Sequence, residues 1–380
     1  MRGIEKKLDK LLISKIEVVD ELYLSGSSFG KMNYRKAVMD SVMEWRNDKK
    51  KAKLILQVIP KKDTQPEGHY WILRKIALSD YDGSFALPVQ TITVDRLIEY
   101  NKSYRKSRGI VENLAIAFYA KVGLRPWIIA ERISTCYDSV IYVGYDISYQ
   151  HKTGQRGMGG IVVFDAKGQV IDFFDLDLQV EEGDRINEAS FREFINRIIL
   201  SAEASKEKPD LIVFHRDGDY YYDEVQKIRS YMNREGYDYI ILSFPKLRSA
   251  FPLFKKNTIM QLAESGYYAE LGWQLAKDGK WYITYGIQSL GEEIPIGVPP
   301  DILKFRLIEQ KTRKKKCEKI LSDIMRQTFW LTRLNYATKF GYAKLPITVH
   351  YAHKLANVKR NNIALAPFEK IKYSKPIWMI

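Results

Sequence analysis

Cysteine is scarce in this chain, and long apolar runs are absent from it. Two cysteines in 380 residues, Cys136 and Cys317, are too few for a disulfide framework or a cysteine-rich zinc site. No apolar run approaches the roughly 20 residues that a membrane-spanning helix needs. The first ten residues, MRGIEKKLDK, contain no hydrophobic signal core. We therefore expect a cytoplasmic protein that does not associate with membranes.

Acidic residues are outnumbered by basic ones, 46 to 61, which gives a formal net charge of +15. Such an excess favours polyanionic partners, and nucleic acid fits better than an anionic membrane because no basic amphipathic helix stands out. A lysine-rich surface of the thermophile type is the alternative explanation. A hydrophobic fraction of 46% excludes a mostly disordered chain, and the length predicts two domains.

The first third of the chain predicts a small α/β domain. Residues 1–50 alternate charged and apolar positions, which indicates short helical pieces rather than a compact domain; the family resemblance given below implies that they are a linker and docking segment. Between 51 and 127, KLILQVIP and LPVQTITV are strand patterns, and VENLAIAFYAKVG is a helix pattern ended by glycine. HYWILRKIAL, between the two strands, fits a helix or a strand.

The region 128–380 begins with the strand order of an RNase-H-like fold. The segment DSVIYVGYDIS and the two strands within MGGIVVFDAKGQVIDFFDLDL form a meander, with a turn at 166–168. A helix with apolar residues at helical spacing follows, and PDLIVFHRDG is then a fourth strand. A right-handed crossover would place this strand parallel to the first and beside it.

Two aspartates stand at the ends of these strands. Asp146 ends the first strand and Asp217 the fourth, so both are expected to leave the sheet at the same edge. Carboxylates suit Mg²⁺ or Mn²⁺, and two such ions can activate water and stabilise the leaving oxygen of a phosphodiester. Aspartate at a strand end is also a common turn residue, so the joint position, rather than either residue alone, predicts chemistry.

Two histidines near the C-terminus are candidate metal ligands. His350 and His353, in LPITVHYAHKLA, are three residues apart and share one side of a helix. We expect one of them to be functional and the other structural. The remaining histidines, His69, His151 and His215, lack an acidic cluster at metal-ligand spacing and are expected to be structural or surface residues.

These motifs resemble the MID–PIWI half of the Argonaute family. The PIWI resemblance rests on GYDIS, KPDLIVFHRDG, LTRLNYATKFGYAKLPITVHYAHKLA and a short apolar C-terminus. It implies a small Rossmann-like MID domain at 51–127 and an RNase-H-like PIWI domain at 128–380. It also implies a metal site made of two aspartates, a glutamate and a histidine or aspartate. Asp146, Asp217 and His353 match three of these four roles, with Mg²⁺ or Mn²⁺ as the cofactor.

The fourth ligand departs from the family pattern. Where the family has a glutamate in a loop before the fourth strand, EEGDRINEASF places Asp184, whose side chain is one methylene shorter. Glu182, or Glu181, could substitute through a small shift of the loop. We expect Asp184 to be the ligand, with Glu182 as the alternative. A solvated acidic loop with no ligand role is the competing interpretation.

The resemblance in 51–127 implies a site for the 5′-phosphate of a guide strand. The family pattern of a tyrosine, a basic residue, a glutamine, an asparagine and a helical lysine is matched by Tyr70, Arg74, Gln90, Asn113 and Lys121. Arginine at 74 keeps the charge and offers two donors to phosphate oxygens, and Lys75 is an alternative. The tyrosine ring would stack on the first base. The resemblance also places the C-terminal carboxylate of Ile380 beside this pocket.

The implied function is that of a guide-dependent endonuclease, which cleaves a complementary target by two-metal phosphodiester hydrolysis and takes part in host defence. The chain is too short for the N-terminal and PAZ domains, so we expect the PIWI subunit of a split Argonaute, in a heterodimer with a second polypeptide that supplies them. The alternative is a catalytically inactive short Argonaute that binds guide and target and signals to an effector. An unguided RNase-H-like nuclease would leave the Tyr70 to Lys121 pattern unexplained.

Overall fold

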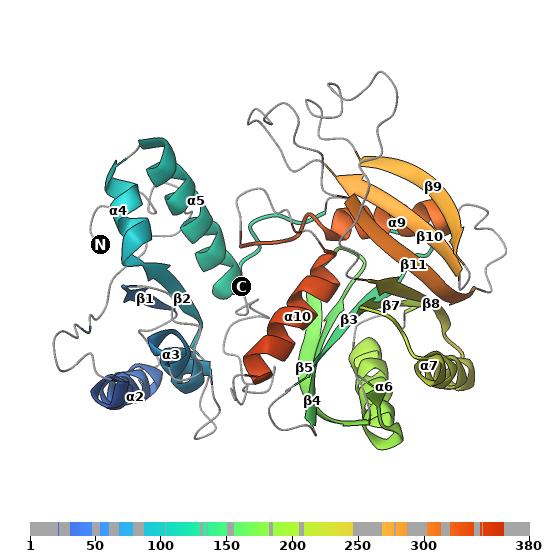
Figure 1. Cartoon of the computed structure of the whole chain (residues 1–380), viewed down its shortest axis with the longest axis horizontal. Helices are drawn as coiled ribbons and strands as arrows, with labels where there is room; N and C mark the ends of the chain where they lie inside the picture. Colours follow the sequence, from blue (N-terminus) through green and yellow to red (C-terminus); the bar gives the residue numbers. More distant parts are fainter. Residues whose placement is uncertain are drawn as a thin grey trace. The chain divides into compact units, whose positions relative to one another are not determined.

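The computed structural model describes two compact units, whose elements are labelled in Figure 1. The first unit comprises Met1–Pro126 with Tyr336–Lys339 and Val358–Ile380, and the second comprises Trp127–Asn335 and Phe340–Asn357. Within the described residues, no helix combines the length and apolar character that crossing a membrane would need. The described residues are 22, 31–47, 54–60, 68–78, 87–102, 104–129, 132–134, 136–149, 156–181, 185–204, 209–245, 268–276, 279–286, 302–312, 320–337, 343 and 345–360.

The first unit has a two-stranded parallel sheet with helices packed on it. Ile55 pairs with Val89 at the start of the two strands, and the pairing stays in register to Ile59 and Thr93. The segment HYWILRKIAL is a helix, and its Ile72, like the other apolar residues of that face, is buried. The elements are α2 (Lys31–Asn47), β1 (Ile55–Ile59), α3 (His69–Leu78), β2 (Val89–Thr93), α4 (Val94–Lys102) and α5 (Tyr104–Lys121).

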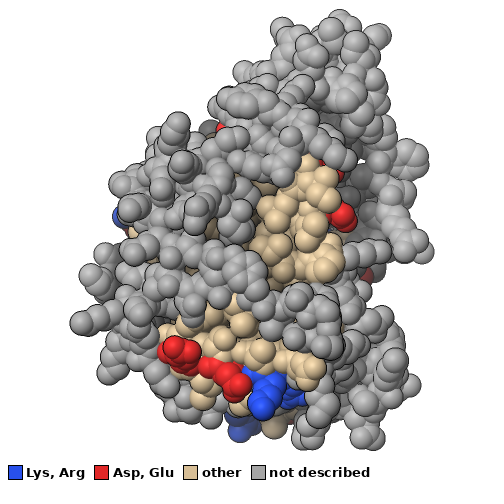
Figure 2. Space-filling view, turned by 90° about the vertical axis from the view of Figure 1, so that its left-hand side faces the viewer, with Lys and Arg blue, Asp and Glu red and all other residues tan. Residues whose placement is uncertain are grey.

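Helix α2 belongs to the core of this first unit. The sequence assigns 1–50 to a linker and docking segment, yet Tyr34, Val38 and Val42 of α2 are buried against α3, β1 and β2. Arg46 adds hydrogen bonds to the carbonyl oxygens of Ile76 and Ala77, at 2.8 and 3.0 Å. On the face drawn in Figure 2, acidic and basic side chains of described residues lie next to each other near the bottom. A docking role for this segment stays a prediction.

The second unit is built on a mixed sheet of nine described strands, in the order β6-β5-β4-β3-β7-β8-β11-β10-β9. The strands are β3 (Val140–Tyr149), β4 (Arg156–Phe164), β5 (Val170–Glu181), β6 (Arg185–Ile186), β7 (Leu211–Asp217), β8 (Asp238–Phe244), β9 (Tyr268–Ala276), β10 (Gly279–Gly286) and β11 (Ile302–Lys311). The helices are α6 (Glu188–Ala204), α7 (Tyr222–Glu235), α9 (Ile320–Leu331) and α10 (Ile347–Arg360).

The predicted strand order is confirmed in this sheet. Strands β3, β4 and β5 are paired antiparallel as a meander, and β7 lies parallel to β3 after the crossover through α6. The α/β fold with an RNase-H-like second part is therefore correct. The antiparallel addition of β11, β10 and β9 beyond β8 is a feature that the sequence did not predict.

The two faces of the sheet carry different helices, as Figure 1 shows for α6, α7 and α10. Side chains alternate between faces along a strand. Ile141, Val143 and Tyr145 of β3 pack in one core cluster with residues of α6 and α7. The intervening residues therefore point to the opposite face, where Gly144 lies against the backbone of Thr348 in α10. Asp146 has the same parity as Gly144, so it faces the side of α10.

Two glycines let α10 lie directly on the sheet. A Cβ atom at Gly144 would lie 2.2 Å from the carbonyl oxygen of Thr348, and one at Gly160 would lie 2.3 Å from that of Ala352. Both contacts are with backbone atoms, which cannot move aside as a flexible side chain does. The close packing of α10 on the sheet therefore depends on the absence of side chains at these two positions.

Gly160→Ala is expected to destabilise the second unit by about 1–3 kcal/mol or more, because the added methyl group overpacks the contact with α10. Urea unfolding of the variant measures this free energy. Gly109→Ala is the matched control, since a Cβ at this position of α5 would meet nothing within 4 Å. It should be neutral or stabilise by up to about 1 kcal/mol. Equal effects of both substitutions would contradict the packing argument.

Candidate functional site

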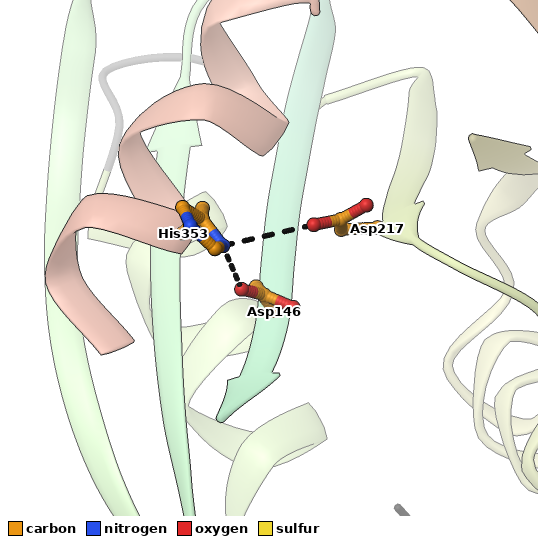
Figure 3. Close-up of side chains that lie close together, drawn as sticks. All are labelled: Asp146, Asp217 and His353. Atoms are coloured by element: carbon orange, nitrogen blue, oxygen red, sulfur yellow. Dashed lines mark hydrogen bonds and ion pairs between the residues drawn. The ribbon is translucent and has the colours of Figure 1, made fainter. Parts of the chain in front are cut away.

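Three side chains from distant parts of the sequence converge at one edge of the second unit (Figure 3). Asp146 lies on β3, Asp217 at the end of β7 and His353 on α10. The Nδ1 atom of His353 is 2.7 Å from Oδ2 of Asp146 and 3.7 Å from Oδ2 of Asp217. One ligand atom from each residue lies within 4.8 Å of the others. The structure thus brings together three of the predicted metal ligands.

Sheet register explains why the two aspartates are neighbours. Gly144 of β3 pairs with His215 of β7 in the parallel ladder, and the pairing continues with Tyr145 and Arg216. Asp146 and Asp217 are the next residues on their strands. Because side chains alternate between the faces of a strand, both aspartates point to the face of the sheet that α10 covers. The close contact between Gly160 and Ala352 of α10 brings the adjacent His353 onto the same face.

The burial of the carboxylates favours a bound cation. The side chains of Asp146 and Asp217 are 7% and 1% exposed, whereas that of His353 is 46% exposed. Two buried carboxylates side by side are costly unless a positive charge compensates them. Two carboxylate oxygens and an imidazole nitrogen also form a donor set that suits a hard divalent cation. The residues present therefore fit a divalent cation of the kind that the family resemblance implies.

Among the other described histidines, His215 and His350 are held neutral. Burial lowers the pKa of His215 to about 3. Burial, followed by the charges of Lys354 and His353, lowers the pKa of His350 to about 3 as well. The ring of His69 packs edge-on against that of Tyr34 in the first unit.

Acidification from about pH 7.5 to about pH 5 is expected to cost about 2 kcal/mol of folding free energy through His215 alone. Burial lowers its pKa from 6.5 to about 3. Between these values the unfolded chain binds a proton that the folded chain does not, so stability falls as the pH drops below about 6.5. Urea unfolding at both pH values measures the change. His215→Phe should lose less stability on acidification, and an unchanged pH dependence would contradict the assignment.

The residues that surround Asp217 fix its strand end. Arg216, on the opposite face, forms a buried ion pair with Glu224 of α7. Gly218 adopts a positive φ of 98°, which favours glycine, and its carbonyl oxygen accepts a 2.8 Å hydrogen bond from Ser243. Sequence reasoning treated Arg-Asp-Gly only as part of a family motif. An arginine followed by an acidic residue in the first turn of the next helix is the signal for the pair with Glu224 that it missed.

In the first unit, the structure links four of the predicted phosphate-binding residues. The ammonium of Lys121 donates to Oε1 of Gln90 at 2.8 Å and to the carbonyl oxygen of Val89 at 2.7 Å. The guanidinium of Arg74 lies 3.8 Å from the ring centre of Tyr70 and donates to the same Val89 oxygen at 3.5 Å. Tyr70, Arg74, Gln90 and Lys121 therefore form one cluster around the start of β2.

Two residues that the sequence did not single out hold Arg74 in this cluster. Its guanidinium donates to Oγ1 of Thr91 at 2.7 Å and to Oε1 of Gln57 at 3.4 Å. All the acceptors are neutral, and burial lowers the pKa of Arg74, an effect that nearby Tyr70 and Tyr34 partly offset. A half-buried cation whose acceptors in the protein are neutral is a favourable place for an anion.

The remaining predicted residues lie on helices of the first unit or outside the described residues. Asn113 is half-buried on α5, two turns before Lys121, and Lys75, the alternative to Arg74, is half-buried on α3. Asp184, Glu182 and Ile380 lie outside the described residues, as does His151. The roles of all these residues stay predictions.

Comparison with known proteins gives a relative and a family. Residues 54–295, well over half of the chain, match the model of the Piwi domain. The Argonaute protein of Pyrococcus furiosus is 26% identical over 278 residues, which make up 72% of this chain and 33% of that protein. The chain therefore spans about a third of the length of this relative.

Solved structures agree with the fold. The crystal structure of Drosophila Piwi gives a TM-score of 0.69 at 18% identity, and the match covers 100% of this chain and 48% of that one. Clostridium butyricum Argonaute bound to a guide DNA and a 19-mer target DNA gives a TM-score of 0.60 at 17% identity, over 87% of this chain and 40% of that one. These structures show a shared fold, and the family match over 54–295 shows that the chain belongs to the Piwi-domain family, with Argonaute proteins among its relatives.

Proposed function

We propose that this chain is a guide-dependent endonuclease that cleaves a complementary nucleic-acid target. The observation that carries the proposal is the convergence of Asp146, Asp217 and His353. The aspartates lie on the neighbouring strands β3 and β7, the histidine lies on α10, and the ligand atoms lie within 4.8 Å of one another. Guide-dependent binding of nucleic acid fits the family, and the net charge of +15 suits a polyanionic partner. Base pairing between guide and target would supply the sequence specificity.

The chain contributes a rigid, prearranged set of ligands to this reaction. Asp146, Asp217 and His353 would hold Mg²⁺ or Mn²⁺, and Asp184, or Glu182 in its place, would supply the fourth ligand. The ions, when bound, activate water and stabilise the leaving oxygen of the phosphodiester. The two aspartates are fixed by adjacent, buried strands, so little reorganisation is needed when substrate binds. By family resemblance, the products carry a 3′-hydroxyl and a 5′-phosphate.

The first unit would anchor the 5′ end of the guide. Arg74 and Lys121 both contact the Val89 carbonyl oxygen, so their charges meet at one point. A terminal phosphate there would replace neutral acceptors with charged oxygens, to which hydrogen bonds are about twice as strong. The guanidinium of Arg74 lies 3.8 Å from the centre of the Tyr70 ring. The aromatic ring of Tyr70 would stack on the first base of the guide.

The test is an incubation of the protein with a 5′-phosphorylated guide and a labelled complementary target in Mn²⁺. Cleavage at a single site that depends on the guide supports the proposal. Cutting at many sites without a guide would instead show an unguided nuclease. DNA and RNA versions of both strands belong in the same experiment.

A second candidate function is guide and target binding without cleavage, in a short Argonaute that signals to an effector. The observation in its favour is Asp184, which stands where the family has a longer glutamate. Tight target binding by the guide-loaded protein with no cleavage in Mn²⁺ would support it. Restored cleavage by Asp184→Glu would then identify the short side chain as the cause. The second polypeptide that the sequence analysis expects stays a separate proposal, which co-purification tests.

A further inference from the structure

His215 occupies a place in the sheet that links the candidate metal site to α10. It lies on β7, two residues before Asp217, and its side chain is fully buried on the same face of the sheet. Its ring packs against those of Phe244 and Tyr142, with ring centres 5.1 and 6.1 Å away. The ring is therefore held in place on the face of the sheet that α10 covers.

The partner of this histidine is the first turn of α10. Nδ1 of His215 is 2.8 Å from Oγ1 of Thr348, which is itself fully buried. Nε2 of the ring has no hydrogen-bond partner in the described part of the chain. A buried N–H without a partner costs more than a buried lone pair, so the neutral ring is expected to carry its proton on Nδ1 and to donate it to Thr348.

The bond to Thr348 constrains the rotation of α10. Gly144 and Gly160 determine how closely the helix approaches the sheet, but both contacts are made to backbone atoms. Thr348 and His353 are five residues apart, which places them about 140° apart around the helix axis. Anchoring the Thr348 side chain to β7 therefore determines whether His353 points along the sheet edge toward Asp146 and Asp217.

We propose that His215 is a positioning residue, which through Thr348 orients α10 so that the imidazole of His353 reaches the two aspartates. The inference rests on the proposed function, because this orientation of α10 matters only if His353 completes a metal site. His215 itself would touch neither metal nor nucleic acid. Partners of this kind, one step removed from the ligands, typically change metal affinity about 10- to 100-fold when they are replaced.

The test compares Thr348→Val, which removes the hydroxyl at nearly constant shape, with Thr348→Ser, which keeps it. In a crystal structure of Thr348→Val, the distance from His353 Nδ1 to Asp146 Oδ2 should lengthen from 2.7 Å to beyond hydrogen-bond range. Calorimetric titration with Mn²⁺ should show affinity about 10-fold weaker. Thr348→Ser should match the original protein in both measurements.

His215→Phe, which retains a ring between Phe244 and Tyr142, is the second variant and should give the same two changes. The combination with Thr348→Val should be no worse than either alone, because both remove one interaction. An unchanged His353–Asp146 distance in either variant would overturn the proposal, even if the melting temperature falls. Asp217→Ala tests the metal site separately: Mn²⁺ affinity that survives it rejects the proposed function, while the crystallographic distance still decides the positioning role.

Discussion

Asp217→Ala is expected to abolish target cleavage by the guide-loaded protein, with a loss of at least about a thousandfold in rate. The loss corresponds to the several kcal/mol of charge stabilisation that a properly held divalent cation supplies. The carboxylate of Asp217 is 1% exposed, at the end of a strand buried on both faces. Its removal leaves Asp146, His353 and the fourth ligand that we propose at Asp184, or Glu182, to hold the cation. A single-turnover assay in Mn²⁺ measures the rate.

The matched control for this variant is Asp138→Ala. Its carboxylate is 85% exposed and forms only a surface ion pair with Arg132, so its loss should leave the rate unchanged. Guide and target binding, measured by gel shift, should be the same for both variants and the original protein. Cleavage by Asp217→Ala at the original rate would reject the assigned role. Loss of binding as well as cleavage would show that the substitution damages the fold.

The parts of this site that follow local rules could be predicted from the sequence. The late position of each aspartate in its strand and the right-handed crossover predicted Asp146 beside Asp217. The expectation that Asp146 ends its strand is wrong, because β3 continues to Tyr149. His353 was a different case. Spacing alone left His350 and His353 open, and the choice came from the family resemblance. The structure distinguishes them physically: His350 is half-buried and burial lowers its pKa, whereas His353 reaches Asp146.

Features that depend on contacts between distant segments could not be predicted. Gly144 and Gly160 look like ordinary strand glycines until α10 is placed on them. His215 was expected to be structural or surface-exposed, but nothing in its sequence neighbours indicates the bond to Thr348, 133 positions away. In the same way, the strands β9 to β11 extend the sheet through pairings that a pattern of single segments does not encode.

In the cluster around the start of β2 in the first unit, too, some contacts follow from local geometry and others come from distant segments. Tyr70 and Arg74 are one helical turn apart, so their contact follows from local geometry. The role of Gln57 does not. Its buried amide donates to Tyr34 of α2 and to the carbonyl oxygen of His69, while its Oε1 accepts from Thr91. A glutamine in a strand pattern carries no sign of these partners, since they come from three separate elements.

Arg74→Met is expected to remove most of the preference of the protein for a 5′-phosphorylated guide. The substitution keeps much of the side-chain volume but deletes a half-buried charge whose acceptors in these hydrogen bonds are all neutral. A charged hydrogen bond to phosphate contributes about 1.5–3 kcal/mol, so the affinity for the phosphorylated guide should fall about 10- to 100-fold. The affinity for the same guide with a 5′-hydroxyl should change little. Fluorescence anisotropy with both guides measures the ratio.

Arg96→Met separates this effect from a general loss of positive charge. Arg96 lies on α4 in the same unit, its side chain is 65% exposed, and it pairs with Glu99. Loss of a positive charge that contacts only the nucleic-acid backbone weakens the binding of both guides equally. This variant should therefore leave the ratio of the two affinities unchanged. If the original protein binds the two guides with equal affinity, Arg74 and Lys121 do not form a phosphate site. The buried charges around Val89 would then serve the packing of α3 and α5 on β2 alone.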